Sequence, residues 1–266
     1  MTREELVHQI KTKKTYLCVG LDTDLEKIPK HLLSHKNPIV EFNKQIIDAT
    51  KDYCVSYKIN TAFYEARGVK GWEEMEQTVA YIPNTHFKIA DAKRGDIGNT
   101  SSQYAKAFLE TLNFDAITVS PYMGSDSVQP FLEYKNKWTI LLGLTSNKGS
   151  VDFELQQAGE KLLYEKVLKT AQEWGTPNNL MFVVGATQAD SFINIRKIAA
   201  KSFLLIPGVG AQGGDLKEIS KKAMIDDVGI LINASRAIIY AGSNTDFATE
   251  AKKIAKEYQE EMSHYL

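Results

Sequence analysis

The sequence predicts an α/β protein, a single (β/α)8 barrel, from two observations. Short β-prone runs alternate with amphipathic segments along the whole chain of 266 residues. Eight strands and eight helices in roughly 250 residues is the count of a (β/α)8 or TIM barrel. The competing fold is a doubly wound open sheet, which carries a glycine-rich dinucleotide fingerprint after its first strand. Here Gly20 is followed by Leu-Asp-Thr-Asp, so that fingerprint is missing.

The expected elements follow one another without a low-complexity linker, so we expect residues 1–266 to form one barrel domain. Thr2 and Glu5 make a capping-box pattern, which predicts a short polar N-terminal helix and is incompatible with a signal peptide. The strands are expected at residues 16–21, 54–59, 87–91, 116–120, 139–144, 181–185, 203–207 and 229–233. The helices are expected at residues 39–52, 72–82, 100–112, 124–135, 156–174, 188–200, 214–222 and 245–262. The longest irregular stretch, residues 145–153, follows the fifth strand and would lie over one mouth of the barrel.

Composition indicates an ordinary globular protein, which we expect to be cytoplasmic. Hydrophobic residues make up 43% and charged residues 24% of the chain, and the formal net charge is -1. This balance gives no electrostatic basis for a nucleic-acid or membrane partner. Cys18 and Cys54 lie inside apolar runs without metal-ligand spacing, so we expect reduced, buried thiols. The apolar runs are also too short to span a membrane.

The most informative stretch runs from Asp91 to Asp96 and places two carboxylates and a lysine at the end of the third strand. Side chains alternate along a strand, so Asp91 and Lys93 point to the same side, roughly 7 Å apart at the backbone. Taken alone, the pattern also fits a solvated charged loop. Alternation in the first two strands favours a site, because it places Asp22 and Lys58 on the inward side as well. Barrel enzymes hold their active sites at these strand ends.

A second candidate site follows the seventh and eighth strands. Residues 207–215 contain four glycines, which let the backbone approach a ligand and point N–H groups at it. Arg236, after the eighth strand, offers a guanidinium group suited to bidentate contact with an oxyanion. Loops at these two positions are a recurrent phosphate-binding place in barrels. We therefore expect a phosphorylated substrate.

Together these residues resemble the orotidine 5′-phosphate decarboxylases, and in detail the longer bacterial type of that family. The family's D-x-K-x-x-D signature stands at Asp91, Lys93 and Asp96, with Lys58 on the preceding strand. The resemblance implies decarboxylation of orotidine 5′-monophosphate to uridine 5′-monophosphate, the last step of de novo UMP synthesis. Lys93 would stabilise and protonate a carbanion at C6, while Asp91 and Asp96 keep the lysine charged. Lys58 would fix Asp91 and contact the ribose.

The resemblance also assigns binding roles and partners. The binding residues it implies are Asp22 and Thr100 for the ribose, Ser146 for the pyrimidine amide edge, and Gln212, Gly213 and Arg236 for the 5′-phosphate. It implies a homodimer with shared active sites, in which Asp96 and Thr100 reach the partner's ribose. No metal and no other cofactor is expected.

Two alternatives stay open. A Mg²⁺-dependent phosphosugar decarboxylase or aldolase shares the D-x-K-x-x-D pattern on the same fold, but is expected to carry an acidic metal ligand in place of Lys58. Loss of activity in a chelator would identify that class. The other alternative is a non-catalytic barrel that binds a phosphorylated ligand. Four inward charges argue against it, because buried charge without a task is costly.

Overall fold

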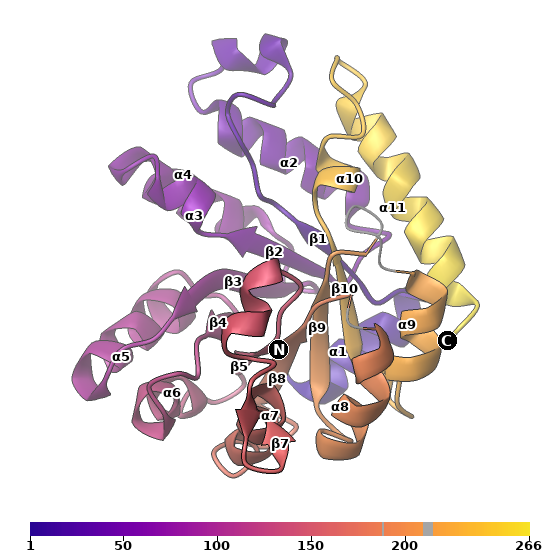
Figure 1. Ribbon diagram of the computed structural model, residues 1–266. Coiled ribbons are helices and arrows are strands. Elements are labelled where there is room, and N and C mark those ends of the chain that lie inside the picture. Colours follow the sequence, from indigo (N-terminus) through magenta and orange to yellow (C-terminus); the bar gives the residue numbers. More distant parts are fainter. Residues whose placement is uncertain (188, 210–214) are drawn as a thin grey trace.

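The computed structural model describes residues 1–187, 189–209 and 215–266, and within them eight parallel strands close into one barrel. Around the barrel the strands follow the order β1-β10-β9-β8-β5-β4-β3-β2 (Figure 1). In chain order they are β1 (Leu17–Gly20), β2 (Ser56–Asn60), β3 (Phe87–Arg94), β4 (Ala116–Val119), β5 (Trp138–Leu144), β8 (Leu180–Val184), β9 (Phe203–Pro207) and β10 (Ile230–Ala234). The predicted (β/α)8 barrel is confirmed, and every expected strand overlaps an observed one.

Helices cover the outside of the barrel (Figure 1). The main ones are α2 (Pro38–Thr50), α4 (Val69–Tyr81), α5 (Gly98–Ala105), α6 (Ser125–Leu132), α7 (Leu163–Ala171), α8 (Phe192–Ile198), α9 (Leu216–Ala223) and α11 (Phe247–Ser263). Two short helices, α3 (Ala62–Glu65) and α10 (Arg236–Ile239), follow β2 and β10. The amphipathic pattern explains the packing: α2 buries Ile39, Phe42 and Ile46 against the barrel and leaves its charged side chains outside.

One expected helix is wrong in its first part. The prediction placed a helix over residues 156–174, but α7 begins only at Leu163. The preceding residues form an antiparallel hairpin, β6 (Gln157–Ala158) and β7 (Lys161–Leu162). Gly159 turns the chain between them with a φ of +79°, a conformation that glycine adopts without steric cost. The stretch 145–153 also contains a short 3-10 helix, Lys148–Asp152.

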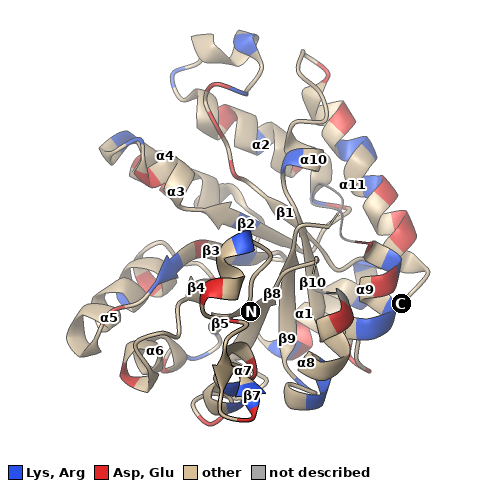
Figure 2. Cartoon of the chain, in the orientation of Figure 1, with Lys and Arg blue, Asp and Glu red and all other residues tan. Residues whose placement is uncertain are grey.

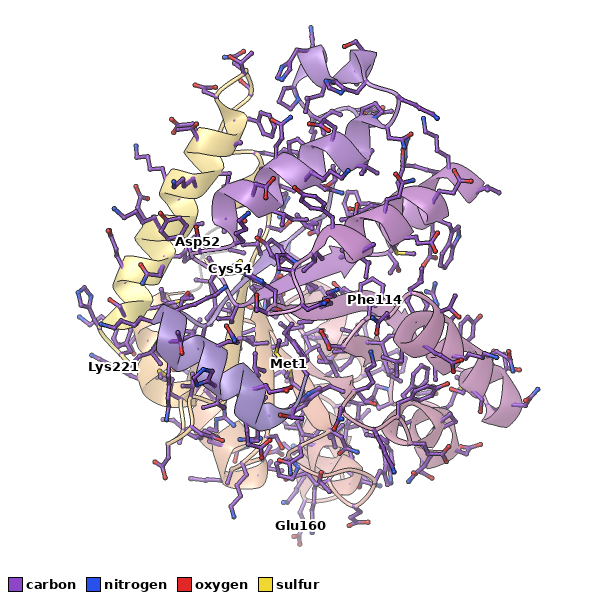
Figure 3. All side chains as sticks on the ribbon, turned by 180° about the vertical axis from the view of Figure 1, so that it is seen from behind. Met1, Asp52, Cys54, Phe114, Glu160 and Lys221 are labelled. Atoms are coloured by element: carbon purple, nitrogen blue, oxygen red, sulfur yellow. The ribbon has the colours of Figure 1, made fainter. Side chains whose placement is uncertain are left out.

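The helix α1 (Arg3–Lys13) lies across the N-terminal end of the barrel (Figure 3). Its first turn is a complete capping box, in which Thr2 Oγ1 accepts from the Glu5 N–H and Glu5 accepts from the Thr2 N–H. Arg3 anchors the helix, because its guanidinium pairs with Asp227 at 2.7 Å and lies 4.9 Å from the ring centre of Phe203. With α1 closing this end, the opposite mouth is the end that a ligand can enter.

In β1 and β2, the side chains inside the barrel are small or polar, whereas those pointing outward are larger and mostly apolar. The Tyr57 hydroxyl lies 2.8 Å from Thr50 on α2, so Tyr57 faces outward and Lys58 faces inward. In the same layers, Gly20 pairs with Lys58 and Cys18 pairs with Ser56. Cys18 is a free, buried thiol, and burial raises its pKa to about 12, so it stays protonated at neutral pH.

Charges of both signs cover the outer helices. Figure 2 shows lysine and arginine interleaved with aspartate and glutamate along α9 and α11. A surface of this mixed kind suits a protein that stays dispersed in water. No helix in the described ranges is long and apolar enough to cross a membrane.

Candidate active site

Charged side chains meet around Asp91 at the carboxyl ends of β2 and β3. Lys58 Nζ lies 2.8 Å from Asp91 Oδ2, and Lys93 Nζ lies 2.5 Å from Asp91 Oδ1. Asp22, just after β1, adds a second carboxylate 3.6 Å from Lys58 Nζ. The four residues form a row of alternating charge. They are the four charged residues that side-chain alternation marks as inward, and the structure brings them together.

Lys93 lies in an irregular part of β3. Its φ is +47°, a left-handed conformation that is uncommon outside glycine. The pairing with β4 shifts here, because the three residues between Ala90 and Arg94 face a single residue of β4, Thr118. The Lys93 N–H donates to Thr118 Oγ1 at 2.8 Å, and the Thr118 hydroxyl donates to Asp91 Oδ1 at 3.1 Å. One hydroxyl therefore holds both the Lys93 backbone and the Asp91 carboxylate.

Mutual pairing keeps this cluster ionised in spite of burial. Burial opposes the charged form of Asp91, but the ammonium groups of Lys58 and Lys93 outweigh it and hold the pKa of Asp91 well below its usual range. Burial likewise opposes the Lys58 ammonium, and Asp91 and Asp22 outweigh it, so the pKa of Lys58 lies above its ordinary value. The Lys58 side chain is 4% exposed and that of Lys93 is 51% exposed. The site therefore holds a buried ion pair beside an ammonium group that a ligand can reach.

A cavity of about 170 Å³ adjoins the cluster at the mouth of the barrel. Its lining includes Lys58, Asp91, Asn233, Ser235 and Arg236. Arg236 is exposed at the start of α10. The cavity thus joins a site of alternating charge to a guanidinium group, an arrangement that suits a ligand with an anionic group at one end.

Asp96 and Thr100 lie away from this cavity. Asp96 is partly exposed and accepts a hydrogen bond from the Ile97 N–H at 2.8 Å. Thr100 is exposed on α5. Within the described part of the chain, neither side chain forms a hydrogen bond or an ion pair with the cluster around Asp91.

The remaining expected residues lie beyond β5 and β9. Ser146 follows β5 and packs on Gly185, because a Cβ at Gly185 would come within 2.6 Å of the Ser146 Cβ. Gln212 and Gly213, expected to bind phosphate, lie outside the described residues. Of the expected phosphate-binding side chains, the structure therefore places only Arg236.

Reasoning from charge missed two neutral side chains of the site, Thr118 and Asn233. Thr118 is fully buried in β4, and Asn233 is 7% exposed in β10. Each is a polar residue in an otherwise apolar strand, Ala-Ile-Thr-Val and Ile-Leu-Ile-Asn-Ala. That signal was available in the sequence, because a polar side chain inside a barrel strand needs a partner.

The carboxylates of the cluster already have a cationic partner from the protein. Among the described residues, no three histidine, cysteine, aspartate or glutamate side chains gather in a way that could hold a metal ion. Lys58 Nζ lies between Asp22 and Asp91, where a cation bridging the two carboxylates would sit. Together with the Lys93 ammonium on Asp91, it balances their two negative charges.

Known proteins match the chain over nearly its whole length. The Orotidine 5′-phosphate decarboxylase / HUMPS family matches residues 15–254. The chain belongs to this family. A protein of Flavobacterium johnsoniae named orotidine 5′-phosphate decarboxylase is 56% identical over 269 residues, which cover 100% of this chain and 98% of that protein. A Bacteroides fragilis protein of the same name is 56% identical over 270 residues, with coverage of 100% and 98%.

Solved structures show the same barrel. OMP decarboxylase of Leishmania donovani matches with a TM-score of 0.82 at 35% identity, over 97% of this chain and 99% of that one. UMP synthase of the same organism matches with a TM-score of 0.84 at 37% identity, over 96% of this chain, which spans 56% of that longer protein. The resemblance to the orotidine 5′-phosphate decarboxylases, stated from Asp91, Lys93 and Asp96, is confirmed at the level of the family. All the residues of the cluster lie inside the matched region.

Proposed function

We propose that the protein decarboxylates orotidine 5′-monophosphate to uridine 5′-monophosphate, with Lys93 as the group that stabilises and protonates the C6 carbanion. The observation that carries this proposal is the ion-paired array of Lys58, Asp91 and Lys93 beside a cavity that ends at Arg236. Family membership and relatives named for this activity support it. Such a reaction needs fixed charge near C6, because the pyrimidine ring offers the carbanion no adjacent carbonyl as an electron sink.

The chemical step uses only groups of the protein and the substrate. The bond from C6 to the carboxylate carbon breaks, its electron pair stays on C6, and carbon dioxide leaves. The Lys93 ammonium, which Asp91 holds at 2.5 Å, offsets the negative charge developing on C6. A proton then passes from Lys93 to C6, and solvent returns a proton to the lysine, which is about half exposed.

The other side chains hold the substrate in register with this charge. Arg236 binds the 5′-phosphate, and Asp22 and Lys58 bind ribose hydroxyls between the phosphate and the reacting carbon. Ser146 hydrogen-bonds the pyrimidine amide edge from the loop after β5. Binding energy from the phosphate, which does not react, positions C6 against Lys93.

We further propose that the active unit is a homodimer, with Asp96 and Thr100 completing the partner's site. Both residues lie on the mouth side of the barrel but away from their own cavity, which is the placement a shared site requires. Large apolar side chains are exposed close by: Ile97 is 61%, Tyr122 83%, Met123 45% and Phe153 63% exposed. An exposed apolar group of this size is typical of a surface that a second subunit covers.

The position of Lys58 argues against the metal-dependent alternative. A divalent cation would need the oxygens of Asp22 and Asp91, and the Lys58 ammonium already bonds or pairs with both. Bringing a dication next to that buried lysine would add like-charge repulsion in a poorly screened site. The electrostatics of the cluster therefore favour chemistry that relies on lysine.

The Lys93→Ala variant tests the catalytic proposal. We expect turnover to fall by roughly 10,000-fold or more, since the variant lacks both the stabilising charge and the proton donor. The assay follows the loss of orotate ultraviolet absorbance when pure protein meets orotidine 5′-monophosphate. UMP binding and the melting temperature are expected to stay close to wild type, because Lys93 is half exposed. Lys106→Ala, at an exposed lysine outside the mouth, is the control. Near-normal turnover by Lys93→Ala would remove Lys93 from the mechanism.

A further inference from the structure

Asn233 has a buried side chain that its own protein leaves without a partner. It lies on β10, is 7% exposed and lines the cavity between the Asp91 cluster and Arg236. Its Oδ1 atom is fully buried and accepts no hydrogen bond from any residue that the structure describes. Buried polar atoms in native proteins are nearly always paired, because an unpaired one costs free energy. A polar side chain kept at such a cost, and facing a cavity, points to a partner that enters from outside.

Asn233 Oδ1 lies close to Gly20 of the neighbouring strand β1. On the adjacent strand, a Cβ at Gly20 would lie 3.3 Å from Asn233 Oδ1 and 2.7 Å from the Ser235 Cβ. The absence of a side chain at Gly20 thus lets the ends of β1 and β10 approach closely. The hydroxyl of Ser235 is engaged elsewhere, since it donates to the Gly20 carbonyl at 3.1 Å.

A second residue that lines the same cavity, Asp22, also carries an orphan acceptor. Asp22 Oδ1 is also buried without a hydrogen bond, although Lys58 Nζ lies 3.6 Å away as an ion-pair partner. Two acceptor oxygens in one cavity call for a ligand that brings hydrogen-bond donors. A phosphate at neutral pH offers mainly acceptors, whereas the two hydroxyl groups of a ribose each offer a donor.

We propose that Asn233 is a substrate-binding residue that determines sugar specificity, with its Oδ1 accepting a hydrogen bond from one ribose hydroxyl of the nucleotide. The inference rests on the proposed function, because it takes a ribonucleotide as the ligand. Asn233 lines the same cavity as Lys58, Asp91 and Arg236. The sugar of a 5′-nucleotide, which joins the reacting base to the phosphate, would lie in this cavity. A site that pairs a buried acceptor with a hydroxyl rejects the deoxy ligand, which leaves the acceptor unpaired.

The first test compares Asn233→Leu with a matched control, Thr139→Val. Thr139 Oγ1 is also a buried, unpaired atom of a barrel strand, but Thr139 does not line the cavity. Both changes remove an unpaired polar group, so we expect melting temperatures equal to or above that of wild type. UMP affinity, measured by calorimetry, should fall roughly five-fold in Asn233→Leu and stay unchanged in Thr139→Val. Asn233→Ala, which adds no methyl groups, should show the same loss of affinity. If both Asn233 variants bind UMP within two-fold of wild type, the inference is wrong.

The second test locates the hydrogen bond with 2′-deoxy-UMP and 3′-deoxy-UMP. Wild type should bind one of the two roughly five-fold less tightly than UMP because of this contact, and that difference should disappear in Asn233→Leu and Asn233→Ala. An equal loss for UMP and both deoxy ligands would show a steric effect and overturn the inference. So would a lower melting temperature confined to the Asn233 variants, since that indicates a structural role.

The inference and the proposed function can fail separately. If wild type decarboxylates orotidine 5′-monophosphate but does not distinguish UMP from the deoxy ligands through Asn233, the proposed function stands and the inference fails. If wild type neither turns over the substrate nor binds UMP, both fail.

Discussion

At the scale of single residues, the site depends on how Thr118 holds Asp91 and Lys93. The left-handed backbone of Lys93 is unfavourable for a lysine and persists where surrounding contacts fix it. Thr118 supplies such a contact to the Lys93 N–H, and it also orients the carboxylate that pairs with the Lys93 ammonium. A fully buried neutral side chain thereby sets the geometry of the charged groups.

We expect Thr118→Val to lower kcat about ten-fold, because the lysine and its carboxylate lose their common anchor. The unfolding free energy should fall by about 1 kcal/mol, since the partly buried Lys93 N–H loses its acceptor. If Thr118 had only a structural role, the folded Thr118→Val variant would keep the kcat of wild type. Thr118→Ser keeps the hydroxyl and should restore most of kcat. Steady-state kinetics on the three proteins, with UMP affinity as a check on binding, measure this. Equal kcat in all three would contradict the positioning role.

A second residue-scale expectation concerns His86, which is buried at the start of β3. Burial, and then the nearby Lys13 ammonium at 2.8 Å, lower the pKa of His86 to about 4, while Asp52 acts in the opposite direction. The unfolded chain therefore binds a proton at this histidine below about pH 6.5, and the native protein does not until about pH 4. Native stability consequently falls as the pH drops through this window.

We expect this titration to cost wild type about 2 kcal/mol between pH 7 and pH 4.5. Urea unfolding at the two pH values measures it, and the His86→Gln variant, which does not titrate, should lose less stability by that amount. Asp91 affects the comparison little, because its lowered pKa contributes stability that is lost only as the pH falls below about 4. An equal pH dependence in wild type and His86→Gln would show that the histidine is not the titrating group.

The four inward charges were accessible from the sequence for a simple reason. Asp22, Lys58 and Asp91 end strands whose alternation can be counted, so their common direction follows from the period of two. Lys93 reaches Asp91 from an irregular backbone to which this period does not apply. The role of Thr118 could not be counted in this way. It depends on the irregular pairing of β3 with β4. The register shifts there, and a regular alternation of side chains cannot predict such a shift.

At the scale of elements, hydrogen bonds from side chains to backbone carbonyls stabilise the end of the barrel opposite the site. Arg196, on α8, donates to four carbonyl oxygens: those of Ala223, Ala199, Ser202 and Gly229. These carbonyls lie at the ends of α8 and α9 and just before β9 and β10. Burial, followed by the charge of Arg3, lowers the pKa of Arg196 to about 10, so it remains charged at neutral pH. One guanidinium thus joins α8 and α9 to the starts of two strands.

We expect Arg196→Met to lower the unfolding free energy by about 3 kcal/mol, because buried carbonyls lose a charged donor. Arg196→Lys should recover little, since one ammonium cannot reach four acceptors in the geometry of a guanidinium fork. Lys197→Met, at the neighbouring exposed position, is the control and should leave stability unchanged. Chemical denaturation measures the difference. The kcat of the folded Arg196→Met protein should match wild type, because Arg196 lies at the end of the barrel opposite the site. A large fall in kcat would show that Arg196 also affects the site.

The hairpin of β6 and β7 shows why one element escaped prediction. Leucines at 155, 162 and 163 continue the apolar pattern of the following helix, which favoured one helix over residues 156–174. The contrary signal was Gly159-Glu160, a two-residue connection with glycine first, which is typical of a tight hairpin. The turn preference of Gly159-Glu160 determined the structure here, and the apolar period alone does not detect such a turn.

At the scale of the whole molecule, the exposed apolar side chains gather on one side of the mouth. The rings of Tyr122 and Phe153 lie 6.4 Å apart between centres, and they belong to the segments that follow β4 and β5. Met123 lies near the end of β3, since a Cβ at Gly95 would be 3.5 Å from its Cε. Ile97 follows two residues after Gly95, beside Asp96. A partner subunit that covered this group would bring its own mouth toward Asp96 and Thr100.

The shared site can be tested by mixing two inactive variants, Lys93→Ala and Asp96→Ala. In a mixed dimer, one site combines the intact Lys93 of one subunit with the intact Asp96 of the other. Random exchange makes half of the dimers mixed, each with one good site of two, so about a quarter of wild-type activity should return. The same mixture carrying Tyr122→Asp in both subunits should stay inactive and elute as monomer, because a buried aspartate opposes association. Ile193→Asp is the matched control, at a residue 54% exposed on α8, and should still allow recovery. No recovery after verified subunit exchange would mean that each barrel builds its site alone.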